Sequence, residues 1–188
     1  MRVLGISPFH DSSVAIINNG RIEYFNKEER LSGIKRDHYS FKVLDFIKNN
    51  IEGDIDIAVV SSPASEDDFN HFLAYFLSRT FNCKVERLCH EHHLSHASLA
   101  FTNSGFQSAL VVVVDRMGSG FRGTMREAES IFKVDQEYNF EPIYKSYWLY
   151  RTGPEFDENN FGRVLELKDT YPNCEIVADS CLSIQKVF

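Results

Sequence analysis

The pair Asn19-Gly20 places the strongest constraint on the fold, because it stands between the apolar segments "SSVAII" and "RIEYF". Both residues tolerate the positive φ that a tight primed turn requires, so the pair predicts a β-hairpin. The segment "RVLGIS" precedes this hairpin and is also apolar. The first 28 residues therefore predict three short strands, of which the second and third are antiparallel neighbours.

Helices and strands alternate after the hairpin. Apolar residues recur at helical spacing over residues 40–51 and again over residues 65–81, where Ser65 can cap the second helix. The short apolar run at 55–63 predicts a strand between these helices, and the segment "KVERL" at 84–88 is expected to be a strand after them.

The strand predicted at 108–115, "SALVVVVD", has five consecutive bulky aliphatic residues, which favours a strand covered on both faces. Two further strands are expected at 128–134 and 141–148. The element order β-β-β-α-β-α-β-α-β predicts an α/β fold of the actin-like ATPase (ASKHA, ribonuclease-H-like) type, with a mixed five-stranded sheet plus an extra β-hairpin. We expect residues 1–150 to form one half-domain and residues 151–188 to be an irregular segment leading into a truncated second half.

Composition excludes several classes of protein. The chain has 188 residues and a net charge of −7, which argues against broad electrostatic binding to nucleic acid or anionic lipid. The sequence has neither a signal-peptide pattern nor a long apolar run, so we expect a soluble, cytoplasmic protein without a membrane partner. The four cysteines form no CxxC pair, which favours free thiols in a reducing compartment.

The segment "HEHHLSHASLAF", residues 90–101, holds four of the seven histidines. His92 and His96 are four positions apart and would share one helix face, as paired metal-binding histidines do. The glutamate of a HExxH peptidase is absent, so that activity is not expected. Asp115 ends a predicted buried strand, where ligands collect in α/β sheets. The alternatives are a helix end with solvated imidazoles and an aspartate that caps the following turn.

A second group of polar residues lies in "SPFHDSS", the turn between the first two predicted strands. Turn amides near Ser12 and Ser13 can cradle an anion, and Asp11 adds a carboxylate. His10 can act as a general base on a hydroxyl near neutral pH. The alternative is a β-turn that is held by an Asx-type hydrogen bond.

A third cluster, "NKEERLSGIKRDHYSF", is a charged segment that we expect to be a loop before a helix. Arg30 or Lys35 in this loop could reach a phosphate or carbamoyl oxygen. The alternative is a solvated charged loop without a ligand.

Three segments that contain these polar residues together resemble the NodU/CmcH-type carbamoyltransferases. "GISPFHDSSVAIINNGRIEYFNKEERLSGIKRDHYSF" is similar to the family's opening pattern, in which HDSSAAL, a hairpin and EEER follow a glycine-containing strand. "HHLSHASLAF" resembles the family's HHLAHAASAF, and "VVVVDRMGSG" resembles its strand ending in VDGxGE. The resemblance covers residues 2 to about 148.

The resemblance implies a fold and a reaction. The family joins an actin-like domain, akin to the enzyme that threonylcarbamoylates tRNA adenosine, to a C-terminal YrdC-like domain. The YrdC-like domain makes carbamoyl-adenylate from carbamoyl phosphate and ATP, and the actin-like domain transfers the carbamoyl group to an acceptor hydroxyl.

The resemblance also implies roles for individual residues. A divalent metal, iron in the family, would be bound by His92, His96 and Asp115. His10 would be the base, with Asp11 beside the nucleotide or metal. The residues expected to contact ATP or carbamoyl-adenylate are Ser12, Ser13, Arg30 and Lys35.

The sequence departs from the family in three ways. The further aspartate that completes the family's metal site has no candidate, a YrdC-like region is absent, and Arg116-Met117 follow Asp115 where the family has glycine. We therefore expect the N-terminal, acceptor-side portion of an O-carbamoyltransferase, weakly active or inactive by itself.

The expected partners are a small acceptor with a hydroxyl, such as a sugar, an antibiotic precursor or a nucleoside, and a complementary chain with a YrdC-like domain. Apolar surface on an unclosed half-domain could also pair two copies of the chain. The alternatives are a non-catalytic nucleotide- or metal-binding module, a subunit of a split enzyme and, third, a metal-dependent hydrolase.

Overall fold

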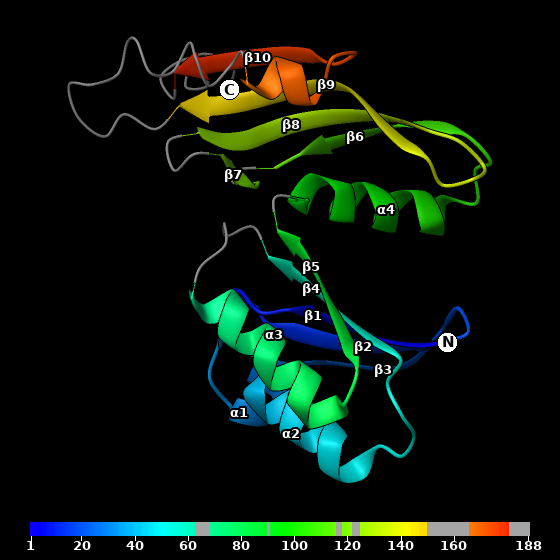
Figure 1. Ribbon diagram of the computed structural model, residues 1–188, viewed down its shortest axis with the longest axis vertical. Coiled ribbons are helices and arrows are strands. Elements are labelled where there is room, and N and C mark those ends of the chain that lie inside the picture. The colour runs from blue at the N-terminus through cyan, green and yellow to red at the C-terminus, as the bar shows by residue number, and fades with distance from the viewer. Residues whose placement is uncertain (63–67, 90, 116–117, 122–124, 150–165, 181–188) are drawn as a thin grey trace. The chain divides into compact units, whose positions relative to one another are not determined.

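Two β-sheets organise the chain, one in each of two units, Met1–His90 and Glu91–Phe188. Figure 1 shows the elements of both units in a computed structural model. The structure describes residues 1–62, 68–89, 91–115, 118–121, 125–149 and 166–180.

The sheet of the first unit has the strand order β3-β2-β1-β4-β5. The pairs β1–β2 and β2–β3 are antiparallel, whereas β1–β4 and β4–β5 are parallel. Asn19 and Gly20, with φ of 48° and 79°, form the predicted hairpin turn. The mixed five-stranded sheet of a ribonuclease-H-like half-domain is thereby confirmed. Its strands are β1 (Arg2–Ser7), β2 (Ser13–Asn18), β3 (Arg21–Lys27), β4 (Ile57–Ser62) and β5 (Lys84–Cys89).

Helices α2 (Phe41–Asn50) and α3 (Asp68–Phe81) pack on one face of this sheet. Their buried residues share one core with alternate residues of the strands, because strand side chains alternate between faces. This core contains Leu4, Ile6, Val14, Ile16, Val43, Leu44, Ile47, Ala58, Val60, Leu73 and Leu77. The predicted cap Ser65 lies outside the described residues.

Part of the predicted charged loop is a short helix, α1 (Glu28–Ser32). Glu28 is 3% exposed, and its carboxylate accepts hydrogen bonds from the backbone N–H groups of Lys42 (2.8 Å) and Val43 (3.0 Å). Ser40, at the N-cap position of α2, makes no side-chain cap hydrogen bond. Glu28 therefore caps α2 from another element, which local patterning does not reveal.

The second unit has the strand order β10-β9-β8-β6, with β7 paired to β8. The β9–β10 pair is parallel, and the other pairs are antiparallel. Residues 166–170 form a helical turn before β10. The elements are α4 (His92–Ser104), β6 (Ala109–Val114), β7 (Gly120–Phe121), β8 (Met125–Val134), β9 (Phe140–Leu149) and β10 (Glu175–Ser180).

Two expectations differ from this architecture. The chain divides after His90, whereas we placed a boundary near residue 150, and Glu175–Ser180 form a strand in the segment expected to be irregular. The prediction that both faces of β6 are covered is wrong for the described residues. Buried residues of β6 pack with α4 in a single core, while Leu110, Val112 and Val114 are 62–73% exposed. The predicted helical segment "SIQKVF" lies outside the described residues.

Two further findings concern the membrane and the cysteines. Among the described residues, no helix is both long enough and apolar enough to cross a bilayer.

Cys83 and Cys174 are free thiols. Burial raises the pKa of both, which keeps them protonated and weakly reactive.

The cap made by Glu28 gives a first prediction. Glu28→Ala leaves two N–H groups of α2 without an acceptor, so the free energy of unfolding should fall by about 1–3 kcal/mol. Urea unfolding followed by circular dichroism measures the change. Glu52→Ala, at an exposed position in the same unit, is the matched control and should change stability by less than about 0.5 kcal/mol. Equal effects of the two substitutions would contradict the capping role.

Candidate metal centre

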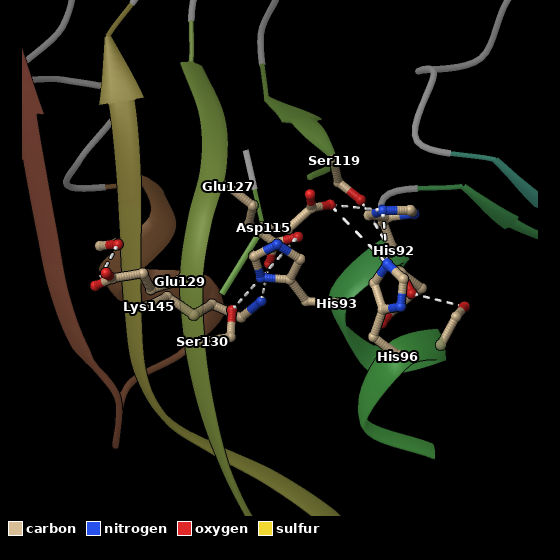
Figure 2. A network of polar contacts seen from close by, with 12 residues as sticks. His92, His93, His96, Asp115, Ser119, Glu127, Glu129, Ser130 and Lys145 are labelled. Atoms are coloured by element: carbon tan, nitrogen blue, oxygen red, sulfur yellow. Dashed lines mark hydrogen bonds and ion pairs between the residues drawn. The ribbon is translucent and has the colours of Figure 1, made fainter. Parts of the chain in front are cut away.

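Three potential metal ligands converge in the second unit. His92 and His96 lie on α4, and Asp115 follows β6 directly. The His92 Nε2 atom is 2.8 Å from Asp115 Oδ2 and 3.0 Å from His96 Nε2. The distance from His96 Nε2 to Asp115 Oδ2 is 4.0 Å, and the three potential ligand atoms all lie within 4.8 Å of one another. The structure thus brings together the three residues that the sequence analysis selected (Figure 2).

Local structure explains this convergence. Two residues four positions apart lie on one face of a helix, so His92 and His96 project together from α4. The backbone N–H of Asp115 donates a hydrogen bond to the carbonyl of Ala128 on β8 (3.0 Å). Ser119 Oγ accepts a hydrogen bond from the backbone N–H of His92 (3.0 Å), which ties the start of α4 to the segment after Asp115.

The three side chains suit a divalent cation. The side chains of His92 and Asp115 are 20% and 30% exposed, and that of His96 is 51% exposed, so the group is open on one side. Burial lowers the pKa of His92, and the neighbouring charge of His96 lowers it further. A lower pKa keeps His92 neutral near pH 7, and neutral imidazole is the form that binds metal. Two imidazoles and a carboxylate suit iron, zinc or a similar ion.

A buried polar network lies beside this group and was not predicted. His93 is 0% exposed, and its Nδ1 atom is 2.8 Å from Ser130 Oγ and 3.8 Å from Glu127 Oε2. Glu127 forms an ion pair with Lys145 of β9. The sequence carries no clear signal for this network, because Glu127 is one of several charged residues in the β8 segment "MREAESIFKV".

The predicted base and its neighbour lie in the first unit. The His10 Nδ1 atom is 3.1 Å from Asp11 Oδ2, and Lys27 Nζ is 3.8 Å from Asp11 Oδ1. The hydrogen bond with His10 lowers the pKa of Asp11, and the charge of Lys27 lowers it further. Asp11 has φ of 60°, in the left-handed region that aspartate tolerates better than most residues. Asp11 therefore stays ionised and can orient the imidazole.

The four residues expected to bind the nucleotide fall into two groups. Ser12 is 1% exposed and its hydroxyl is hydrogen-bonded to that of Ser40, so it is not presented to a ligand and our expectation for it is corrected. Ser13 begins β2, Arg30 lies on α1 with its side chain 73% exposed, and Lys35 is exposed. Nucleotide binding by these three stays a prediction. Arg116, expected at the mouth of the metal site, lies outside the described residues.

The buried histidine gives a pH prediction. Burial lowers the pKa of His93 to about 4 from an ordinary value of 6.5, so between these pH values the unfolded chain binds a proton that the folded chain does not. Stability should therefore fall as the pH drops from about 6.5 to 4, by up to about 3 kcal/mol from this residue. Thermal unfolding between pH 7 and pH 4.5 measures the slope, which should be shallower in His93→Gln. Identical slopes would contradict the assignment.

Comparison with known proteins adds little to this description. No family model and no curated protein matches the sequence. The crystal structure of the Aquifex aeolicus member of the Ppx/GppA protein family aligns at 14% identity with a TM-score of 0.36. The alignment covers 90% of this chain and 61% of that protein, so this chain spans less than two thirds of that protein's length. A TM-score this low carries no argument, so the fold assignment rests on the strand order of the first sheet.

Proposed function

We propose that the chain is the metal-binding, acceptor-side part of an O-carbamoyltransferase. It would transfer a carbamoyl group to an acceptor hydroxyl from carbamoyl-adenylate, which a YrdC-like partner domain makes from carbamoyl phosphate and ATP. The observation that carries the proposal is the convergence of His92, His96 and Asp115, whose potential ligand atoms lie within 4.8 Å of one another. These residues belong to two of the three motifs on which the family resemblance rests.

The metal ligands have a defined part in this proposal. His92 and His96 would bind a divalent ion, iron by resemblance, through neutral imidazoles, and Asp115 would supply a negative charge. A bound divalent ion would neutralise phosphate charge on the nucleotide. The exposed side of the group, at His96, would be the side from which the nucleotide phosphate approaches.

The pair His10 and Asp11 would carry the proton transfer. An Nδ1–H of His10 that donates to Asp11 leaves the lone pair on Nε2, and the side chain of His10 is 66% exposed. Nε2 would accept the hydroxyl proton while the acceptor oxygen forms a bond with the carbamoyl carbon. The bond between that carbon and the adenylate phosphate oxygen then breaks, and AMP leaves with the electron pair. Asp11 would hold the tautomer and stabilise the imidazolium.

A non-catalytic nucleotide- or metal-binding module is the second candidate. One observation favours it: only three potential ligands converge among the described residues. Such a module would bind metal and nucleotide without turnover. A subunit of a split enzyme would bind both and become active only with its complementary chain.

Metal uptake tests the metal centre directly. We expect the chain, purified under reducing conditions and titrated with Fe²⁺, to bind about one ion per chain, and the variant His92→Ala with His96→Ala to bind none, because both nitrogen ligands are removed. Elemental analysis after desalting measures the ratio. His71→Ala, which removes an exposed histidine of the first unit, should bind like the wild type. Equal metal in the wild type and the double variant would refute the assignment.

Turnover separates the two candidates. The chain would be assayed with a YrdC-like domain from a carbamoyltransferase, ATP, radiolabelled carbamoyl phosphate and a panel of sugar and nucleoside acceptors. We expect transfer to at least one hydroxyl, and a loss of about 10²–10⁴-fold in His10→Ala because the base is removed. The affinity for 5′-O-sulfamoyladenosine, a stable mimic of the adenylate, should not change in that variant. Binding of the mimic without any transfer would favour the non-catalytic module.

A further inference from the structure

Four polar side chains are buried beside the three metal ligands and are not ligands themselves. We name His93, Glu127, Ser130 and Lys145 the His93 network; none is more than 5% exposed. Figure 2 shows His93 on the side of α4 that faces β8. Successive residues of a helix are about 100° apart, so His93 points away from the face that carries His92 and His96. The ring centroids of His92 and His93 are 6.2 Å apart.

A β-bulge turns Glu127 into this network. The register between β8 and β9 shifts between Glu127 and Glu129, so Ala128 is the extra residue. Glu127 and Ala128 are consecutive and both buried, whereas residues of a regular strand alternate between the two faces. Bulges of this kind redirect side chains and are frequent next to functional sites. The carboxylate of Glu127 thereby reaches Lys145 on the neighbouring strand.

The same short stretch of β8 contacts both elements that supply metal ligands. The carbonyl of Ala128 accepts the N–H of Asp115 (3.0 Å), and Glu127 exchanges backbone hydrogen bonds with the turn at Gly118 (2.9 Å) and Ser119 (3.0 Å). On the helix side, Ser130 Oγ is hydrogen-bonded to His93 Nδ1 (2.8 Å). β8 therefore fixes the position of Asp115 on one side and the first turn of α4 on the other.

Close packing limits movement between these elements. A Cβ atom at Gly118 would lie 2.5 Å from His93 Nε2 and 2.7 Å from Glu127 Cβ. Both distances are shorter than any tolerated contact, so only glycine fits between His93 and the strand. Gly118 thus lies directly against the His93 network.

The network is not the arrangement that stability alone would favour. A buried ion pair generally stabilises a fold no better than apolar residues of similar volume. Two buried atoms of the network, His93 Nε2 and Glu127 Oε2, have no hydrogen-bond partner among the described residues. Unsatisfied buried polar atoms are uncommon in native proteins, and each calls for an explanation.

We propose that the His93 network is a positioning device for the metal centre. It holds the first turn of α4, together with Asp115, Gly118 and Ser119, against one stretch of β8. The potential ligand atoms of the candidate metal centre thereby stay close to one another. This inference rests on the proposed metal site. Residues that orient metal ligands without binding the metal typically change metal affinity about 10–100-fold when they are replaced.

The test replaces the ion pair by apolar residues of similar size, in the double variant Glu127→Leu with Lys145→Met. Its melting temperature should equal or exceed that of the wild type, because no unpaired charge is left buried. Co²⁺ affinity should fall about 10–100-fold, and the visible absorption spectrum of bound Co²⁺ should change, because the ligands are less constrained. Lys133→Met with Glu141→Leu is the matched control, since these residues pair on the same two strands and are exposed.

Two outcomes for the double variant would overturn the proposal, and a second pair of variants decides if the double variant does not fold. Wild-type Co²⁺ affinity and spectrum in the folded double variant would overturn it, as would an equal loss in the control. If the double variant does not fold, Ser130→Ala and Ser130→Thr decide. The alanine removes the hydroxyl that bonds His93 and should weaken Co²⁺ binding about tenfold, while the threonine retains the hydroxyl and should restore it. Unchanged binding in Ser130→Ala would then refute the proposal.

A wild-type chain that takes up no Co²⁺ would refute the metal assignment, and the positioning inference is then decided without metal. Crystal structures of the wild type and the folded variant should differ in the separation of His92 Nε2 and Asp115 Oδ2, which is 2.8 Å in the wild type. We expect this hydrogen bond to break in the variant. Superimposable side chains in the two crystal structures would overturn the inference.

Discussion

The ion pair between Glu127 and Lys145 is the interaction on which, in our proposal, the geometry of the candidate metal centre depends. It places two charges in an interior where neither would be tolerated alone, and so ties β8 to β9 at one register. The bulge at Ala128 makes this pairing possible, because it rotates Glu127 toward the interior. His93 packs against the pair, and the first turn of α4 follows His93. The proposed metal site at the surface of this unit would therefore be held in place by charges beneath it.

The first unit also buries a glutamate, Glu28, whose charge is stabilised in a different way. No described cation forms an ion pair with Glu28; its carboxylate instead accepts hydrogen bonds from two backbone N–H groups at the start of α2. The negative charge at this position also complements the helix dipole. Its neighbour Glu29 hydrogen-bonds the backbone N–H of Arg36 (3.3 Å), so this acidic pair shapes the loop that precedes α2. The charged segment that could have been a solvated loop therefore also holds the start of α2 and the loop before it in place.

The sequence predicted those features that depend on residues close to one another in the chain. The Asn19-Gly20 turn, the apolar stripes of α2 and α3, and the four-residue spacing of His92 and His96 each specify their structure within a few residues. The strand-end position of Asp115 suggested a ligand site, and the family resemblance implied that this aspartate would join His92 and His96. The bulge at Ala128, the cap by Glu28 and the parallel pairing of β10 with β9 were missed. Each of these depends on residues distant in sequence, whose contacts no single segment encodes.

The spacing of the candidate metal ligands along the chain also bears on how quickly the proposed centre can assemble. His92 and Asp115 are 23 positions apart, and the strand that braces them follows within the same unit. The entropic cost of closing a loop rises only slowly with its length, and structures with short-range contacts tend to form faster than those with long-range contacts. During synthesis, the ligands and their brace would emerge almost together. The centre can therefore form in a nascent chain as soon as β9 has been made.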